Sequence, residues 1–212
     1  MTDFEAIPWR ILIGVTGLRK LDNPAAVEAL VKKAIDAEVE GLLPEELPRK
    51  IKLIPREGTT VVSYDVLSSL AEGADRVVAR AVLSYPDARI DAVLPLTLED
   101  YMEDFATEAS RKEFAELLSR CSEPVLLRTR SIRNECGDAD GQAELRKDAY
   151  AEAGRYVVDH CDVLIAVWDG ELARDRGGTG EIVQYALEQN RPVLRVWGGS
   201  YMVLSRGNCA DG

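Results

Sequence analysis

The sequence predicts an α/β fold in which a doubly wound, mainly parallel β-sheet carries helices on both of its faces. Short β-branched runs alternate along the chain with amphipathic segments of about 10–15 residues, which is the pattern of repeated βαβ units. A length of 212 residues suits one generous domain, which we place at 1–212 with its core at 10–197.

The first strand is predicted at 11–15, an apolar run typical of a buried strand. Asn23 followed by Pro24 predicts the N-cap and the first position of the next helix. Residues 41–58 contain three prolines, so we expect an irregular excursion there with a short edge strand at 51–54.

Two further strands are predicted at 60–63 and 90–96, where β-branched residues cluster. The helix between them has an apolar face that begins at Leu70. Thr97, with Asp100 three residues later, resembles a capping arrangement for the helix that follows the second of these strands.

The C-terminal half is predicted to add strands at 125–127, 163–168 and 193–197. Residues 129–143 are polar and contain glycine, and arginines stand at their entrance, so we expect a mobile loop or lid there. Residues 199–212 are expected to form only a short tail.

The charge balance excludes some function classes. The chain has 26 Lys and Arg against 37 Asp and Glu, which gives a net charge of −11. A protein that grips a polyphosphate backbone uses surplus basic residues, so binding of nucleic acid is disfavoured, and so is a membrane surface. No apolar stretch is long enough to span a bilayer, and the N-terminus does not have the pattern of a signal peptide.

The cysteine and histidine content argues against a metal centre. The four cysteines form no CxxC pair, so reduced thiols in a cytoplasmic protein are expected. His160 is the single histidine, which removes His-based metal triads. We expect neither a metal nor a cofactor.

Ligands of such sheets bind beyond the carboxyl ends of the strands, where the strand order reverses. The first loop in such a position follows the strand at 11–15. Its Gly14 and Gly17 allow close backbone approach, while Thr16 and Arg19 offer a hydroxyl and a guanidinium that suit phosphate. The alternative is that the glycines only shape the turn.

The second loop follows the strand at 60–63. Its small hydroxyl residues at 68–69 are expected to open a helix and to leave backbone N–H groups available to an anion. Gly73 would let another segment approach that helix. The alternative is an N-cap followed by a tight contact between helices.

The third loop follows the strand at 163–168. The strand delivers Asp169 to the sheet edge, and a Gly177-Gly178-Thr179 turn begins a helix with Glu181 in its first turn. Glycine N–H groups suit a phosphate, and a nearby carboxylate can bind ribose, act as a nucleophile or stabilise an oxocarbenium ion. The alternative is a glycine turn in which Glu181 merely favours the helix dipole.

Three motifs in these loops resemble one superfamily. SSLAEGAD (68–75) resembles a stretch of the DprA/Smf proteins, and the arginine-proline-valine at 191–193 resembles the opening of their final strand. DVLIAVWDG followed by RGGTGEIVQYA is similar to nucleoside 2-deoxyribosyltransferases and to the PGGxGTxxE motif of LOG-type phosphoribohydrolases. The shared resemblance is to the SLOG (Smf/DprA–LOG) superfamily of Rossmann-like nucleotide-binding domains.

The resemblance implies a pocket for a nucleotide or a nucleotide-derived molecule. The ligand-binding residues that it implies are Gly14, Thr16, Gly17 and Arg19 in the first loop, Ser69, Glu72, Gly73 and Asp75 in the second, and Asp169, Gly170, Gly177, Gly178 and Thr179 in the third. In the family's enzymes the motif glutamate serves glycosidic-bond chemistry, and Glu181 is the matching position. Asp175 is the second candidate catalytic residue, and Arg176 stands where the motif has proline.

Two functions from different classes follow. The first is a sensor or signalling domain for an ADP-ribose-like or cyclic nucleotide, expected in a bacterial defence or stress pathway, that forms a homodimer and acts on an effector domain or protein. The alternative is an N-glycosidase, phosphoribohydrolase or deoxyribosyltransferase that acts on a nucleoside monophosphate through Glu181. A third hypothesis, binding of DNA in the DprA manner, is opposed by the net charge of −11.

Overall fold

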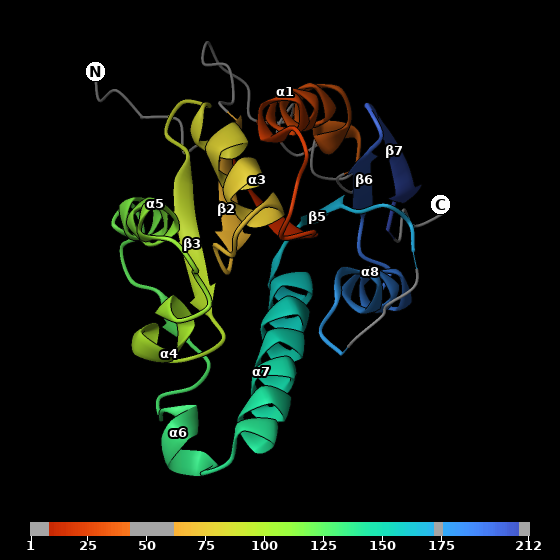
Figure 1. Cartoon of the computed structure of the whole chain (residues 1–212). Coiled ribbons are helices and arrows are strands. Elements are labelled where there is room, and N and C mark those ends of the chain that lie inside the picture. The colour runs from red at the N-terminus through yellow and green to blue at the C-terminus, as the bar shows by residue number, and fades with distance from the viewer. Residues whose placement is uncertain (1–8, 43–61, 172–175, 208–212) are drawn as a thin grey trace, which may run out of the picture.

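The structure is a computed structural model that describes residues 9–42, 62–171 and 176–207 (Figure 1). One seven-stranded sheet has the order β4-β3-β2-β1-β5-β6-β7, and its neighbouring strands are parallel except for β6 and β7. The strands are β1 (Trp9–Gly17), β2 (Val62–Ser68), β3 (Arg89–Leu94), β4 (Val125–Leu126), β5 (Val163–Val167), β6 (Val193–Trp197) and β7 (Ser200–Ser205). The predicted α/β, doubly wound class is confirmed.

Helices cover both faces of the sheet. They are α1 (Pro24–Ala34), which continues into η1 (Ile35–Val39) and η2 (Glu40–Leu42), α3 (Ala74–Leu83), α4 (Leu98–Met102), α5 (Glu108–Leu118), α6 (Ile132–Glu135), α7 (Ala139–His160) and α8 (Thr179–Glu188). Ile13 of β1 packs in the apolar cluster that contains α1 and α3, whereas the neighbouring Gly14 faces Val157 of α7. Since successive strand residues face opposite sides, α1 and α3 cover one face, and α7 and α8 lie side by side on the other (Figure 1).

The strand order reverses between β1 and β5. From β1 the chain builds outward through β2, β3 and β4, and it then returns through α7 to place β5 on the other side of β1. The two strands end together, because Gly17 pairs with Val167 in the parallel register. This is the topological switch point at which a ligand is expected.

The second strand runs further than its sequence indicates. We predicted a strand at 60–63 followed by a helix whose face begins at Leu70, but β2 extends to Ser68 and α3 begins only at Ala74. The reason is Asp65, because aspartate is uncommon in β-strands and its presence argues against a strand that continues through it. Its carboxylate accepts hydrogen bonds from Nε and Nη2 of Arg10 on β1, at 2.5 and 2.6 Å, so the charge is paired within the sheet.

The predicted mobile loop at 129–143 is wrong. This segment holds α6 and the start of α7, with Ser131 and Asp138 as their N-caps. Its polar residues are therefore caps, and Ile132 between them is fully buried. The structure instead places α6 and the first turn of α7 in this segment.

The segment expected as a tail contains a strand. β7 pairs with β6 through a tight hairpin in which Gly198 and Gly199 both have positive φ angles, 60° and 78°. The predicted edge strand at 51–54 lies outside the described residues, as does most of the excursion at 41–58.

Other local predictions are confirmed. The Asn23 side chain caps α1 through the Ala26 N–H, and Thr97 caps α4 through the Asp100 N–H. Cys121, Cys136 and Cys161 are unpaired thiols, and Cys209 lies outside the described residues. Within the described ranges, no helix combines the length and apolar character that crossing a bilayer requires.

The start of α3 is held tightly against the loop after β1. The Ala74 N–H donates to the Leu18 carbonyl at 3.0 Å, and Gly73 has a φ of 79°. A Cβ on Gly73 would lie 2.4 Å from the Leu18 oxygen and 2.5 Å from the Arg19 oxygen. Only glycine allows the two loops to approach this closely.

Gly73→Ala is therefore expected to lower the free energy of unfolding by about 2 kcal/mol or more, through backbone strain and the clash with the Leu18 carbonyl. Gly41→Ala is the matched control, because a Cβ there would meet no atom of the described residues within 4 Å. Urea unfolding of both variants measures the difference. Equal, small changes in the two would show that the approach of the loops does not require glycine.

Candidate functional site

A cavity of about 130 Å³ lies at the carboxyl ends of β1 and β5, and we name it the switch-point cavity. Among the residues that line it, seven were implied by the motifs: Thr16, Gly17, Arg19, Ser69, Asp75, Gly177 and Thr179. The three loops that the sequence singled out therefore meet at one place. Tyr101 of α4 and Tyr150 of α7 complete the polar lining.

The Asp75 carboxylate accepts hydrogen bonds that hold the second loop in its conformation. Its Oδ2 accepts hydrogen bonds from Ser68 Oγ at 2.9 Å and from the Ala71 N–H at 3.2 Å, while Ser68 Oγ accepts from the Leu70 N–H. The expectation that 68–69 open a helix and leave N–H groups available to an anion is therefore wrong. These N–H groups hold a tight turn, in which Leu70 has a φ of 57°.

The same carboxylate is buried at the cavity. Asp75 is 8% exposed, and burial raises its pKa to about 6, although Ser68, Ala71 and the charges of Arg19 and Arg76 act in the opposite direction. A carboxylate that is costly to bury and that faces a cavity is a feature typical of functional sites.

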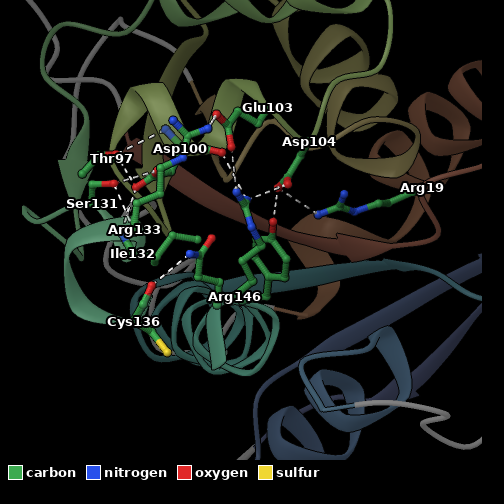
Figure 2. Close-up of polar contacts among 12 residues, drawn as sticks. Arg19, Thr97, Asp100, Glu103, Asp104, Ser131, Ile132, Arg133, Cys136 and Arg146 are labelled. Atoms are coloured by element: carbon green, nitrogen blue, oxygen red, sulfur yellow. Dashed lines mark hydrogen bonds and ion pairs between the residues drawn. The ribbon is translucent and has the colours of Figure 1, made fainter. Parts of the chain in front are cut away.

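Arg19 lines the cavity with a side chain that is 43% exposed, so it lies at the rim. Its guanidinium lies 5.0 Å from the centre of the Tyr150 ring, and its Nη2 lies 3.9 Å from Asp104 Oδ2. Figure 2 shows Arg19 and Arg146 both pointing toward the Asp104 carboxylate, which accepts from Arg146 at 2.7 Å and also from the Tyr150 hydroxyl. Because the Arg19 contact is long, Arg19 is the weakly held member of this group.

Asp100 holds α4 against the segment that begins α6. Burial alone would raise the pKa of Asp100, but hydrogen bonds from Thr97, Ser131 and the Ile132 N–H, with the charge of Arg146, lower it below its usual value. These contacts, drawn in Figure 2, join α4 to the start of α6. They keep Tyr101, in the same helix as Asp100, at the cavity.

Glu181 does not line the cavity. Its Oε1 accepts from Arg155 Nη2 at 2.7 Å, and its Oε2 accepts from the Gly177 N–H at 2.7 Å. The carboxylate thus ties the turn before α8 to α7. Gly177 packs against the backbone of α7, where a Cβ would lie 2.8 Å from the Ala151 nitrogen.

The remaining implied residues lie away from the cavity wall. Gly14 packs against Cys161 and Val157, Gly73 against the first loop, and Gly178 is the N-cap of α8. Glu72 accepts a hydrogen bond from Ser110, and Asp169 accepts one from the Glu171 N–H at 3.0 Å, while Gly170 lies beside Arg195. Asp175 lies outside the described residues.

Tyr101 and Tyr150 line the cavity but belong to none of the three motifs. Tyr101 is 1% exposed and reads as a core aromatic, since it also packs against Phe105 and Phe114. Tyr150 stands in a helix whose partner elements are far away in the sequence. The sequence gives one indication that this part of α7 packs closely against another element, namely the two small residues at 153–154. Gly154 leaves room there for Ile182 of α8.

Within the described part of the chain, no group of three or more His, Cys, Asp or Glu side chains is placed to hold a metal ion. The polar side chains that line the cavity carry hydroxyl, carboxylate and guanidinium groups.

The fold has a solved relative. The X-ray structure of DNA processing protein A (DprA) from Streptococcus pneumoniae matches 89% of this chain and 51% of its own, with a TM-score of 0.53 and 13% sequence identity. The chain thus spans about half the length of that DprA chain. No family model and no curated protein matches the sequence. At this identity the likeness shows a shared fold.

The burial of Asp75 predicts a pH-dependent stability. Its pKa is about 6 in the folded chain and 3.8 as a free side chain, so the native state binds the proton more tightly. Stability should fall as pH rises from 4 to 7, with a cost of about 2–3 kcal/mol that is fully present above pH 7. Asp75→Asn removes this cost, so its stability relative to wild type should increase over that range.

Urea unfolding of wild type and Asp75→Asn at pH 4 and pH 7.5 measures this difference. Asp22→Asn serves as the control, because Asp22 is an exposed carboxylate. If Asp75→Asn changes the stability by the same amount at both pH values, the carboxylate is not held in an unfavourable ionised state.

Proposed function

We propose that this domain binds a nucleotide or nucleotide-derived small molecule in the switch-point cavity and acts as a ligand sensor. The observation that carries the proposal is the convergence of Arg19, Asp75 and the hydroxyls of Thr16, Ser69 and Thr179 at the ends of β1 and β5. In open α/β sheets this is where ligands bind.

The rim of the cavity suits a phosphate. Arg19 offers a guanidinium, which binds phosphate in a forked geometry, and α8 begins at Thr179, which also lines the cavity. The N-terminus of a ten-residue helix adds a favourable dipole for an anion. These local groups would offset the repulsion from a net charge of −11.

The weak hold on Arg19 supports sensing. A cavity of about 130 Å³ is smaller than the ~300–1,000 Å³ of common ligand pockets, so a nucleotide must widen it. A phosphate that draws Arg19 away from Asp104 would loosen the contact that joins the first loop to α4 and α7. Movement of α4 or α7 would then transmit the signal to a second copy of the chain or to an effector.

Glycosidic-bond chemistry through Glu181 is the second candidate. The resemblance to LOG-type enzymes favours it, but both Glu181 oxygens are engaged, by Arg155 and Gly177. Catalysis would require this carboxylate to leave two partners and to turn into the cavity. We therefore place sensing ahead of catalysis, and we place the domain in the cytoplasm, where unpaired thiols are usual.

A thermal-shift screen tests the proposal with AMP, ATP, ADP-ribose, cyclic ADP-ribose, NAD and cyclic mono- and dinucleotides. A ligand at a hundredfold its Kd should add about 2.7 kcal/mol to the stability of wild type. Arg19→Gln should weaken that ligand by about 10–100-fold because a charge-assisted contact is lost, whereas the exposed Arg111→Gln should not. If no compound stabilises the chain, the nucleotide pocket is refuted.

The Glu181→Gln variant separates the two candidates. A sensor should keep its affinity in this variant within about threefold, because Glu181 lies off the cavity wall. Chromatography of each ligand after incubation with wild type should return it intact. Release of free base and ribose phosphate by wild type, abolished in Glu181→Gln, would establish the glycosidase instead. A gel shift with single-stranded DNA at low salt should show no retardation.

A further inference from the structure

We infer that the inner end of the switch-point cavity is a subsite for a ribosyl hydroxyl, which donates a hydrogen bond to Asp75 and accepts one from Tyr101. The inference rests on the proposed function and goes beyond it, because it assigns which part of the ligand enters the cavity and which two side chains bind that part.

The first observation is that one oxygen of the Asp75 carboxylate accepts no hydrogen bond from the described residues. Asp75 is 8% exposed and lines the cavity, yet both of its hydrogen bonds go to Oδ2, from Ser68 and Ala71. Among the described residues, Oδ1 has no hydrogen-bond partner. A partnerless oxygen on a carboxylate that lines the cavity favours a ligand that donates a hydrogen bond to it.

The second observation is that the Tyr101 hydroxyl makes no hydrogen bond with the described residues. Tyr101 is 1% exposed and also lines the cavity, and its ring packs against Phe105 and Phe114. Its hydroxyl has no hydrogen-bond partner among the described residues. Burial and the nearby charge of Asp75 both raise the pKa of Tyr101, so the phenol keeps its proton and can donate it.

The two groups together select a hydroxyl. A hydroxyl both donates and accepts, so a single one can satisfy the acceptor on Asp75 and the donor on Tyr101. An ammonium group would leave the Tyr101 proton unpaired, and a phosphate would meet the Asp75 carboxylate with like charge. Thr16 and Ser69 on the same wall add hydroxyls for the rest of a sugar ring.

The cavity also fixes the orientation of the ligand. The Arg19 side chain is 43% exposed and Asp75 is 8% exposed, so the positive group is the outer one and the carboxylate the inner one. A phosphate therefore binds outside at Arg19 while the sugar points inward. The size of the cavity, about 130 Å³, agrees with the entry of a sugar rather than of a base with its sugar.

The test measures the affinity of wild type, Asp75→Asn and Tyr101→Phe for AMP, 2′-deoxy-AMP, 3′-deoxy-AMP and ribose 5-phosphate by calorimetry at pH 7.5. We expect wild type to bind AMP at least tenfold more tightly than one of the two deoxy analogues. Each variant should lose about tenfold or more for AMP and ribose 5-phosphate, because a buried hydrogen bond is removed. For the discriminated deoxy analogue the variants should lose less than threefold.

A matched variant tests whether the loss of any buried phenol hydroxyl weakens AMP binding. Tyr64→Phe removes another buried phenol hydroxyl, distant from the cavity, and should leave AMP binding unchanged. Both Asp75→Asn and Tyr101→Phe keep the shape of the side chain, and their thermal unfolding is measured beside the binding.

The failures of the two proposals are distinguishable. If wild type binds AMP but treats both deoxy analogues alike, or if Asp75→Asn and Tyr101→Phe weaken all probes equally, the ribosyl subsite is refuted and nucleotide binding stands. If wild type binds none of the four probes and no compound of the wider screen, nucleotide binding itself is refuted, and the subsite with it.

Discussion

The close contact between the start of α3 and the loop after β1 is the constraint on which the cavity depends. Gly73 lets the Ala74 N–H reach the Leu18 carbonyl at 3.0 Å, and Gly17 lets β1 end against Ala74 and Val167. These contacts bring the ends of β1 and β5 and the first turn of α3 together. Glycine is required because a Cβ at either position would lie 2.4 Å from a neighbouring atom. Thr16, Arg19 and Asp75 meet at one cavity as a consequence.

Around this contact the fold holds buried charges that a purely structural core would avoid. Asp100 has its charge satisfied by Thr97, Ser131 and Ile132, and it serves as a joint between α4 and α6. Asp75 differs, since one oxygen holds the second loop, the other has no hydrogen-bond partner among the described residues, and the residue lines the cavity. Burial of a charge without full pairing lowers stability. That contrast is the physical argument for function at Asp75 rather than at Asp100.

The family resemblance and the geometry divide the motif residues between two roles. Gly14, Gly73 and Glu181 match motif positions, yet Gly14 and Gly73 lie at close backbone approaches and Glu181 bonds to Arg155 and Gly177. Such residues give the site its shape without lining it. Since a fold hosts many functions, the functional argument has to rest on the side chains that reach the cavity, and on Tyr101 and Tyr150, which no motif contains.

The sequence by itself determined the α/β class, the helix caps at Asn23 and Thr97, and the three loops that meet at the cavity. Local periodicity and capping chemistry carry that information, because they depend on neighbours along the chain. Only the tertiary structure decided the length of β2 and the helical segments at 129–143, since Asp65 pairs with Arg10 and the Ile132 N–H bonds to Asp100, both far away in the sequence. The strand β7 was decided by its pairing with β6 across a short hairpin. The roles of Glu181 and Tyr101 were also decided by the tertiary structure, because packing between separate helices sets what each side chain contacts.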